Sequence, residues 1–358
     1  MSLRRASALV PALALALSSC AALGADGDAA AGGSGGDAPT VAAAFYPLGW
    51  VAEQVAGDRA EVELLTSPGA EPHDLELGVG ETATVAGADV VLLLDGFQPA
   101  VDEAAAESAE GSVLDAADVV DLRVADDPHD HEGEHEGEHA GESAEDHAEH
   151  EGEHAGESAE DHAEHEGEEH TEGDGHTEGD GHDHGDSDLD PHFWLDPQRM
   201  ADLGDAVADE LAAVDPDGAA DYEAAAADLR TRLEQLDAEY AEGLASCARD
   251  TVVVNHDAFA YLERYGLDFE PIAGLSPDSE PTPGDLARLQ DVIADEGVTT
   301  VFSERLVSPK TAETLASDLG IEADVLDPLE GLTDETAGED YLSLMRANLS
   351  ALQAANGC

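Results

Sequence analysis

Histidine is the residue type best suited to chemistry in this chain of 358 residues, and it is unevenly distributed. Of the 16 histidines, 13 fall between residues 125 and 190, and three lie elsewhere. His73 lies in EPHDLEL, His192 in DPHFWLDP and His256 in NHDAFAYL. Each follows a predicted strand or ends a loop, which is the carboxyl-edge position where open α/β sheets bind ligands. These three histidines are therefore the first candidates for a binding site.

A fourth candidate is Asp327, in VLDPLEGL, which follows the last predicted strand. Taken alone, a loop-end histidine usually hydrogen-bonds the backbone, and an Asp before Pro usually starts a turn. The convergence of all four positions on one edge favours a metal site instead. Three imidazoles and one carboxylate suit tetrahedral zinc, whereas manganese prefers more oxygen ligands. We therefore predict that His73, His192, His256 and Asp327 bind Zn²⁺.

The segment from Ala125 to Asp190 differs in composition from the rest of the chain. Its 66 residues contain 28 Asp or Glu, 13 His and 11 Gly, with no Lys, Arg or aromatic residue, and EGEHAGESAEDHAEH occurs twice in succession. Such a segment cannot bury a core, so we predict disorder. Clustered imidazoles favour auxiliary zinc binding, and an acidic solvated loop with incidental histidines is the alternative. The auxiliary ligands would be His129, His131, His135, His139, His147, His150, His154, His162, His165, His170, His176, His182 and His184.

The elements that must position these residues predict an α/β fold in two halves. Strands are predicted at 40–46, 61–65, 89–95 and 119–122, and again at 251–255, 267–272, 298–303 and 321–326. In the second half the predicted helices are 258–265, 283–296, 309–319 and 339–354. Strand then helix, four times in each half, predicts two lobes that each hold a four-stranded, mainly parallel sheet. Between them, residues 217–246 predict one rigid helix of about 30 residues, long enough to span both lobes.

The N-terminus predicts export and lipid attachment. Arg4 and Arg5 precede the apolar run 8–17, which is too short to remain as a membrane span. LSSC, ending at Cys20, resembles a bacterial lipobox, with an ordinary signal peptide that contains a cysteine as the alternative. Residues 21–39 are rich in Gly, Ala, Ser and Asp and predict a flexible tether. We therefore expect an extracytoplasmic protein that meets the membrane only through its lipid.

The two remaining cysteines are Cys247 and Cys358. Outside the cytoplasm an even pair favours one disulfide, and two free buried thiols are the alternative. The predicted domains are a signal peptide at 1–19, a tether at 20–39, a first lobe at 40–215 that includes the insert at 125–190, a linker helix at 216–246 and a second lobe at 247–358.

The charge of the chain restricts its partners. With 13 basic residues against 84 acidic ones, the formal net charge is −71. Such a chain is repelled by nucleic acid and by anionic membrane surfaces, so neither is an expected partner.

The quoted motifs also resemble a known family. EPHD, DPHFWLDP, HDAFAYLERYGL and VLDPL, in this order and interrupted by a His-rich acidic insert, are similar to the ZnuA-like zinc-binding lipoproteins of bacterial ABC importers, the cluster A-I or cluster 9 family. The resemblance covers about residues 40–358. It implies two lobes joined by one long helix, with zinc in the cleft between them. The implied partner is a membrane permease, and we expect a monomer.

The resemblance assigns roles to individual residues. It implies ligands matching His73, His192 and His256 and a fourth position that is Asp, Glu or water, of which Asp327 matches the Asp variant. Manganese-binding relatives tend to carry Glu where His256 stands. Some zinc-binding members have a disulfide in the second lobe, consistent with the two cysteines. The expected function is capture of Zn²⁺ and its delivery to the permease for uptake.

Two other functions remain as alternatives. A secreted zinc hydrolase also uses three histidines, but no H-E-x-x-H or G-x-S-x-G motif supplies a mechanism, so we do not expect an enzyme. A metal-storage or adhesive lipoprotein would use the insert for binding and the lobes as scaffold. Glu71 and Glu304 could orient an imidazole, although a turn or cap role is favoured for both. Trp194 is predicted to pack in the core.

Overall fold

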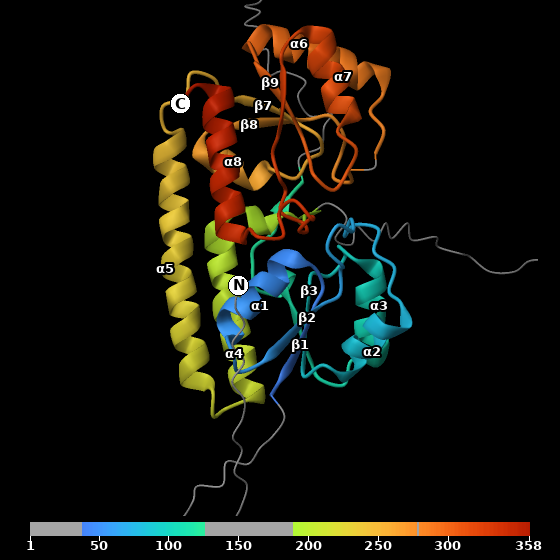
Figure 1. The fold of residues 1–358 in the computed structure, drawn as a ribbon, viewed down its shortest axis with the longest axis vertical. Helices are drawn as coiled ribbons and strands as arrows, with labels where there is room; N and C mark the ends of the chain where they lie inside the picture. Colours follow the sequence, from blue (N-terminus) through green and yellow to red (C-terminus); the bar gives the residue numbers. More distant parts are fainter. Residues whose placement is uncertain (1–37, 126–188, 278) are drawn as a thin grey trace, which may run out of the picture. The chain divides into compact units, whose positions relative to one another are not determined.

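The structure is a computed structural model that describes residues 38–125, 189–277 and 279–358. The predicted signal peptide, Cys20, most of the tether and all 13 histidines of the insert lie outside these described residues. The fold is built from two parallel sheets and the helices around them (Figure 1).

The first sheet has four parallel strands in the order β2-β1-β3-β4. They are β1 (Thr40–Ala43), β2 (Glu61–Leu64), β3 (Val90–Leu93) and β4 (Ser112–Asp115), with α1 (Tyr46–Ala56), α2 (Val79–Gly87) and α3 (Pro99–Ser108) between them. The two central strands, β1 and β3, are almost fully buried, as their continuous apolar sequences require.

The fourth strand corrects the sequence prediction, which was wrong to place it at 119–122. The Asp115 side chain accepts a hydrogen bond from the Ala117 backbone N–H and so caps the 3₁₀ helix η1 (Ala116–Asp118) directly after β4. The chain therefore turns away from the sheet before it reaches the apolar residues beyond. Val120 is 3% exposed, so it is buried in the core without belonging to a strand.

The second sheet repeats the topology of the first. Its order is β10-β9-β7-β8, which, read from the other edge, is again second, first, third, fourth. The strands are β7 (Thr251–Val254), β8 (Asp268–Pro271), β9 (Thr300–Ser303) and β10 (Glu322–Val325), with helices α6 (Pro283–Glu296), α7 (Lys310–Leu319) and α8 (Tyr341–Asn356). The helix expected at 258–265 is instead the 3₁₀ helix η3 (Ala260–Tyr265), which Gly266 ends with a φ of 86°.

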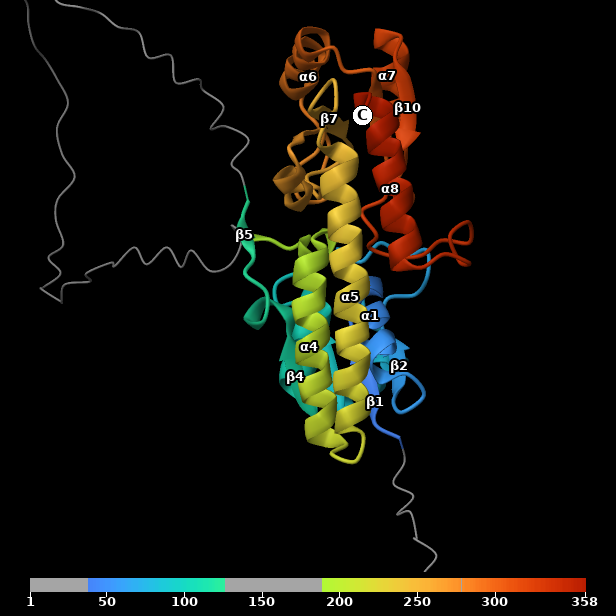
Figure 2. The same ribbon diagram turned by 90° about the vertical axis from the view of Figure 1, so that its left-hand side faces the viewer.

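Two antiparallel helices follow the first lobe, and the second of them continues beside the second lobe. They are α4 (Pro197–Val214), capped by Asp196, and α5 (Ala219–Leu244), which has 26 residues where about 30 were predicted. α5 packs against α1 of the first lobe and against α8 of the second, as Figures 1 and 2 show. One continuous helix therefore contacts both lobes, and it limits how far they can move apart.

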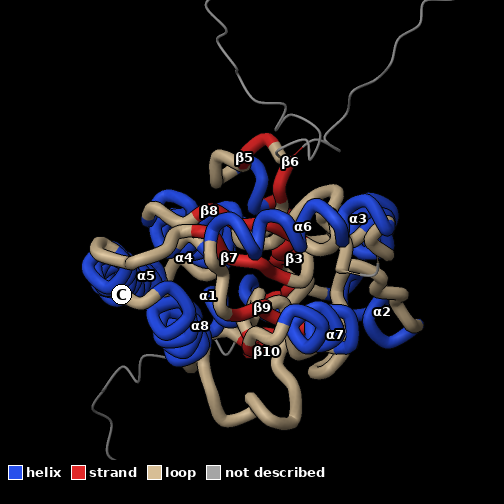
Figure 3. The backbone as a smooth tube through the Cα atoms, turned by 90° about the horizontal axis from the view of Figure 1, so that it is seen from above, coloured by secondary structure: helices blue, strands red, loops and turns tan. Residues whose placement is uncertain are grey.

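A short antiparallel pair brackets the insert. β5 (Arg123–Val124) pairs with β6 (Leu189–Asp190), and Figure 3 shows this pair apart from the two main sheets. The hydroxyl of Tyr261, in η3, donates to the carbonyl of Asp190 at 2.8 Å and accepts from the backbone N–H of Arg123 at 2.9 Å. The prediction of disorder was therefore wrong for residues 189 and 190, which belong to this pair, and its residues 126–188 lie outside the described part of the chain.

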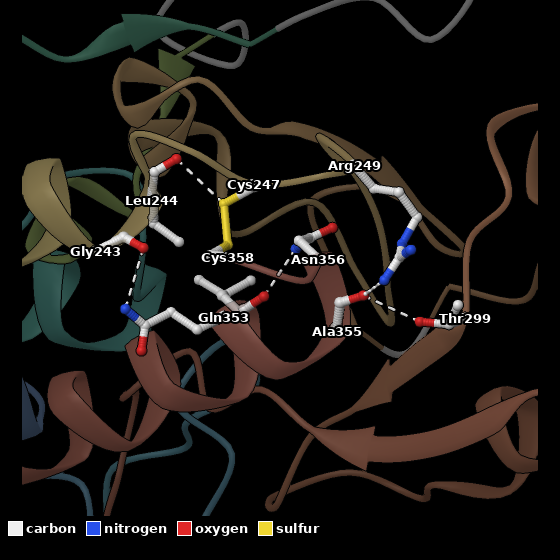
Figure 4. Close-up of a disulfide and its surroundings, with 10 residues drawn as sticks. Gly243, Leu244, Cys247, Arg249, Thr299, Gln353, Ala355, Asn356 and Cys358 are labelled. Carbon is white, nitrogen blue, oxygen red and sulfur yellow. Dashed lines mark hydrogen bonds between the residues drawn. A yellow bond between two sulfur atoms is a disulfide. The ribbon is translucent and has the colours of Figure 1, made fainter.

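The disulfide expected from the cysteine count is present. Cys247 and Cys358 are bonded and join the chain just after α5 to the chain just after α8 (Figure 4). The same junction is closed by polar contacts: the Arg249 side chain donates to the carbonyl of Ala355 at 2.6 Å, and Gln353 donates to the carbonyl of Gly243 at 3.1 Å.

Candidate metal centre

Four side chains from separate loops meet at the carboxyl edges of the strands. Their potential ligand atoms all lie within 4.8 Å of one another, and we call this group the cage: His73, His192, His256 and Glu330. His73 lies in the loop between β2 and α2, and His192 lies between β6 and the 3₁₀ helix η2 (Phe193–Leu195). His256 follows β7, and Glu330 lies in the loop after β10. The cage is therefore formed jointly by the two lobes.

The Glu330 carboxylate is the common neighbour of the three imidazoles. Its Oε1 lies 3.4 Å from Nε2 of His73, 3.5 Å from Nε2 of His192 and 3.4 Å from Nε2 of His256. Nε2 of His192 and Nε2 of His256 are 3.4 Å apart. A tetrahedral zinc site with bonds of about 2.0–2.1 Å separates its ligand atoms by roughly 3.4 Å. The spacing and donor types of the cage therefore fit Zn²⁺.

Two buried carboxylates orient two of the rings. Oδ1 of Asp190 lies 2.7 Å from Nδ1 of His192, and Oε1 of Glu304 lies 2.5 Å from Nδ1 of His256. An acceptor at Nδ1 holds the proton there and leaves the Nε2 lone pair free for a metal. The sequence prediction favoured a turn or cap role for Glu304, whereas the structure shows it bound to the His256 ring. Asp190 was missed because it was counted with the insert.

Burial and neighbouring charges act in opposite directions on the pKa values of the cage histidines. The side chains of His192, His256 and Glu330 are at most 1% exposed, and that of His73 is 14% exposed. Burial lowers the pKa of His256, but its hydrogen bonds to Glu304 and Glu330 outweigh this and raise it to about 10. Burial also lowers the pKa of His192, but its hydrogen bonds to Asp190 and Glu330 outweigh this and raise it.

Glu330 responds in the opposite sense. Burial raises its pKa, but hydrogen bonds from the three histidines outweigh burial and hold the pKa well below the ordinary value. Its second oxygen, Oε2, is buried and has no hydrogen-bond partner among the described residues. These shifts favour imidazolium at His256 and carboxylate at Glu330, and a divalent cation bound in the cage would take the place of protons.

Asp327, the fourth ligand expected from the sequence, lies outside the cage. Its Oδ1 accepts the backbone N–H of Leu329 at 2.9 Å, and its Oδ2 lies 3.1 Å from Nε of Arg305. Leu329 has a φ of 61°, the only positive value outside glycine in the described part of the chain. This left-handed residue reverses the backbone, so that Glu330 faces the histidines while Asp327 faces Arg305.

Residues of the first lobe and of α8 hold the loop that carries Glu330. Trp194 donates its indole N–H to the carbonyl of Pro328 at 2.7 Å, and Tyr341 donates its hydroxyl to the carbonyl of Trp194 at 2.5 Å. The backbone N–H of Gly69 donates to the carbonyl of Leu332 at 2.7 Å. Trp194 is fully buried, as predicted, and it also links the two halves of the site.

Glu71 has the local role that the sequence favoured. Its Oε1 accepts the backbone N–H of His73 at 2.9 Å and so fixes the turn that presents the His73 ring. Burial and the nearby Glu330 carboxylate raise the pKa of Glu71 to about 7.

Comparison with known proteins identifies the family. Residues 41–355 match the ZnuA family, described as the periplasmic component A of a zinc-uptake complex. The chain belongs to this family. The ZnuA family is one of zinc-binding components of uptake systems and not a family of enzymes. Within the described residues no helix is long and apolar enough to cross a membrane.

Individual ZnuA-like relatives agree with this assignment. The chain is 34% identical over 316 residues to the zinc-binding lipoprotein AdcA of Streptococcus pneumoniae, covering 86% of this chain and 54% of that protein. The chain therefore spans about half the length of the AdcA relatives. It is 29% identical over 327 residues to the high-affinity zinc uptake system protein ZnuA of Bacillus subtilis, covering 89% of this chain and 88% of that protein.

A solved structure shows the same fold. The Zn(II)-bound ZnuA-like domain of S. pneumoniae AdcA superposes with a TM-score of 0.64 at 29% identity, covering 90% of this chain and all of that domain.

Proposed function

We propose that this protein captures Zn²⁺ outside the cytoplasmic membrane and delivers it to the permease of an ABC importer. The observation that carries the proposal is the cage, in which three imidazoles and one carboxylate converge at zinc-like spacing. Four protein ligands leave no open coordination position for a metal-bound water, which a zinc hydrolase requires. The site therefore suits binding and release of the ion as cargo.

The donor set also supports zinc over manganese. Three of the four donors are imidazoles, and manganese favours oxygen ligands. Membership of the ZnuA family and the names of the AdcA and ZnuA relatives point to the same metal. The three histidines and Glu330 are the proposed ligands, with Asp190 and Glu304 orienting His192 and His256.

The attachment and the partner belong to the same proposal. Cys20 carries the lipid that keeps the mature chain at the outer face of the membrane, and the protein acts there as a monomer. The partner is the permease, which accepts zinc from the cage. The 13 histidines of the insert bind zinc more weakly, and they capture the ion or sense its abundance and hand it to the cage when supply is low.

The test is a competition titration of the mature chain with a zinc chelator, repeated with Mn²⁺. We expect one tight zinc site, weaker additional sites, and manganese binding that is weaker than the tight zinc site. Deleting residues 126–188 should remove only the weaker sites, because β5, β6 and every cage residue remain. Tighter manganese than zinc binding, or loss of the tight site on deletion, would overturn the proposal.

A further inference from the structure

A cavity of about 590 Å³ lies against one side of the cage. His73 lines it, whereas the other three cage residues do not. His73 is also the cage residue with appreciable exposure, 14% of its side chain, against at most 1% for each of the others. This cavity is therefore the place where the cage meets solvent.

The side chains that line the cavity include acidic residues but no Lys or Arg among the residues that the structure describes. Four aspartates line it: Asp95, Asp115, Asp118 and Asp121. Asp115 has a structural task, because its Oδ1 accepts the backbone N–H groups of Asp95 and Ala117 at 3.1 and 2.9 Å. The side chains of Asp95, Asp118 and Asp121 are exposed and free to act on ions in the cavity.

A neighbouring cavity of about 630 Å³ provides the contrast. It shares Asp121 with the acidic cavity, and three arginines line it together with acidic residues: Arg123, Arg199 and Arg264. No cage residue lines this second cavity. Of the two, only the acidic cavity leads to a metal ligand, and only it lacks the cations that would repel Zn²⁺.

We propose that the acidic cavity is the route by which Zn²⁺ reaches and leaves the cage, and that Asp95, Asp118 and Asp121 set the rate of its association. This inference rests on the proposed function, since it concerns the same ion at the same cage. A pocket lined by one sign of charge raises the local concentration of counter-ions and the rate at which they bind. Most of the lining belongs to the first lobe, with Leu275 and Ser276 from the second. The proposed route thus runs mainly along the first lobe.

Tryptophan fluorescence gives a signal specific to the cage. The Trp194 and His192 rings lie 5.2 Å apart, and the only other tryptophan, Trp50, is stacked on Tyr341. The insert itself contains no tryptophan. Stopped-flow mixing of the full mature chain with excess Zn²⁺ then measures association with the cage.

The charge test replaces three carboxylates at once, as Asp95→Asn, Asp118→Asn and Asp121→Asn. We expect zinc association about fivefold to tenfold slower at low salt, with the difference disappearing near 1 M salt because ions screen the field. The matched control removes the same charge from exposed acids at the start of α5 and in the turn before it, as Asp217→Asn, Glu223→Gln and Asp228→Asn. Its rate should change less than twofold. Equal rates for the two triple variants would overturn the steering role.

The route itself is tested by filling the cavity with Ser276→Phe. A narrowed route slows arrival and departure alike, so association and chelator-driven dissociation should both fall severalfold while the equilibrium affinity stays the same. Unchanged rates would place the route elsewhere. If the unaltered chain showed no tight zinc site, the proposed function would fail, whereas normal affinity with unaffected rates in every variant would overturn only the route.

Discussion

The two lobes share one strand order but hold their ligands in different ways. His256 of the second lobe is fully buried, and its Nδ1 is hydrogen-bonded to Oε1 of Glu304 at 2.5 Å. His73 of the first lobe is partly exposed, packs edge-on against Phe97 and borders the acidic cavity. His256 of the second lobe and the equally buried His192 thus form the fixed side of the cage, and His73 of the first lobe forms the side that the solvent reaches. The contrast suggests a division between retention and exchange of the ion.

The largest effect is expected from removing the fixed ligand. His256→Ala should weaken zinc binding at the tight site on the order of 1000-fold, because it removes one of the four donors of the cage and leaves Glu304 buried without its imidazole partner. Chelator competition measures this affinity. His170→Ala, in the insert, is the matched control and should leave the tight site unchanged. An unaltered tight site in His256→Ala would show that the cage does not need both lobes.

A smaller loss of zinc affinity should follow when His256 is kept and its hydrogen bond to Glu304 is weakened. Glu304→Gln keeps the shape of the side chain and removes the charge that orients His256, so zinc affinity should fall about 10- to 100-fold. Glu313→Gln, at an exposed position in the first turn of α7, makes the same chemical change outside the cage and should have no effect. A Glu304 variant that binds zinc as tightly as the control would mean that packing alone orients the ring.

The raised pKa of His256 predicts opposite pH trends for metal binding and for stability of the metal-free protein. Its pKa is about 10 when folded and about 6.5 when unfolded. The imidazolium therefore stabilises the metal-free fold fully below about pH 6.5, and this contribution is lost as pH rises through about 10. Zinc must displace that proton, so its affinity should rise over the same range, by up to tenfold per pH unit for each proton released.

Calorimetry in buffers with different ionisation enthalpies checks the proton release, and thermal melts of the metal-free chain check the stability. We expect at least one proton released per zinc bound at pH 7.5. Binding without proton release would contradict a protonated cage.

The smallest effect is expected at Asp327. Asp327→Asn keeps an acceptor for the Leu329 N–H and removes only the charge facing Arg305, so affinity should fall less than tenfold. Glu330→Gln, in the same loop, should cost clearly more because it removes the charge that all three imidazoles face. Zinc titrations of the two variants in parallel rank them. The reverse order would return Asp327 to the ligand position that its sequence context suggested.

The sequence was sufficient to predict the two parallel sheets, because short apolar strands separated by helices can be recognised without tertiary information. The carboxyl ends of those strands also made His73 and His256 visible as candidates. Other features depend on contacts that no local pattern reports. Glu304 meets a ring 48 residues away in the chain, and its own surroundings indicated only a turn.

The choice between Asp327 and Glu330 depends on one backbone angle. Both acids stand in VLDPLEGL, and Asp327 was chosen because it directly follows the last predicted strand and matches the Asp variant of the family. Leucine rarely adopts the left-handed conformation found at Leu329, so nothing in the sequence indicates the reversal that brings Glu330 forward. Asp190 was obscured by composition, since it ends the acidic, His-rich segment 125–190 with which it was counted.

The disulfide has a topological consequence for the second lobe. Cys247 and Cys358 are 111 residues apart and close a covalent ring that contains all of β7 to β10, His256 and Glu330. Closing a ring of that length removes chain entropy worth about 4–5 kcal/mol from the denatured state. The ring also changes how the lobe responds to force. A force applied between α5 and Cys358 passes through the disulfide and does not load the strands inside the ring.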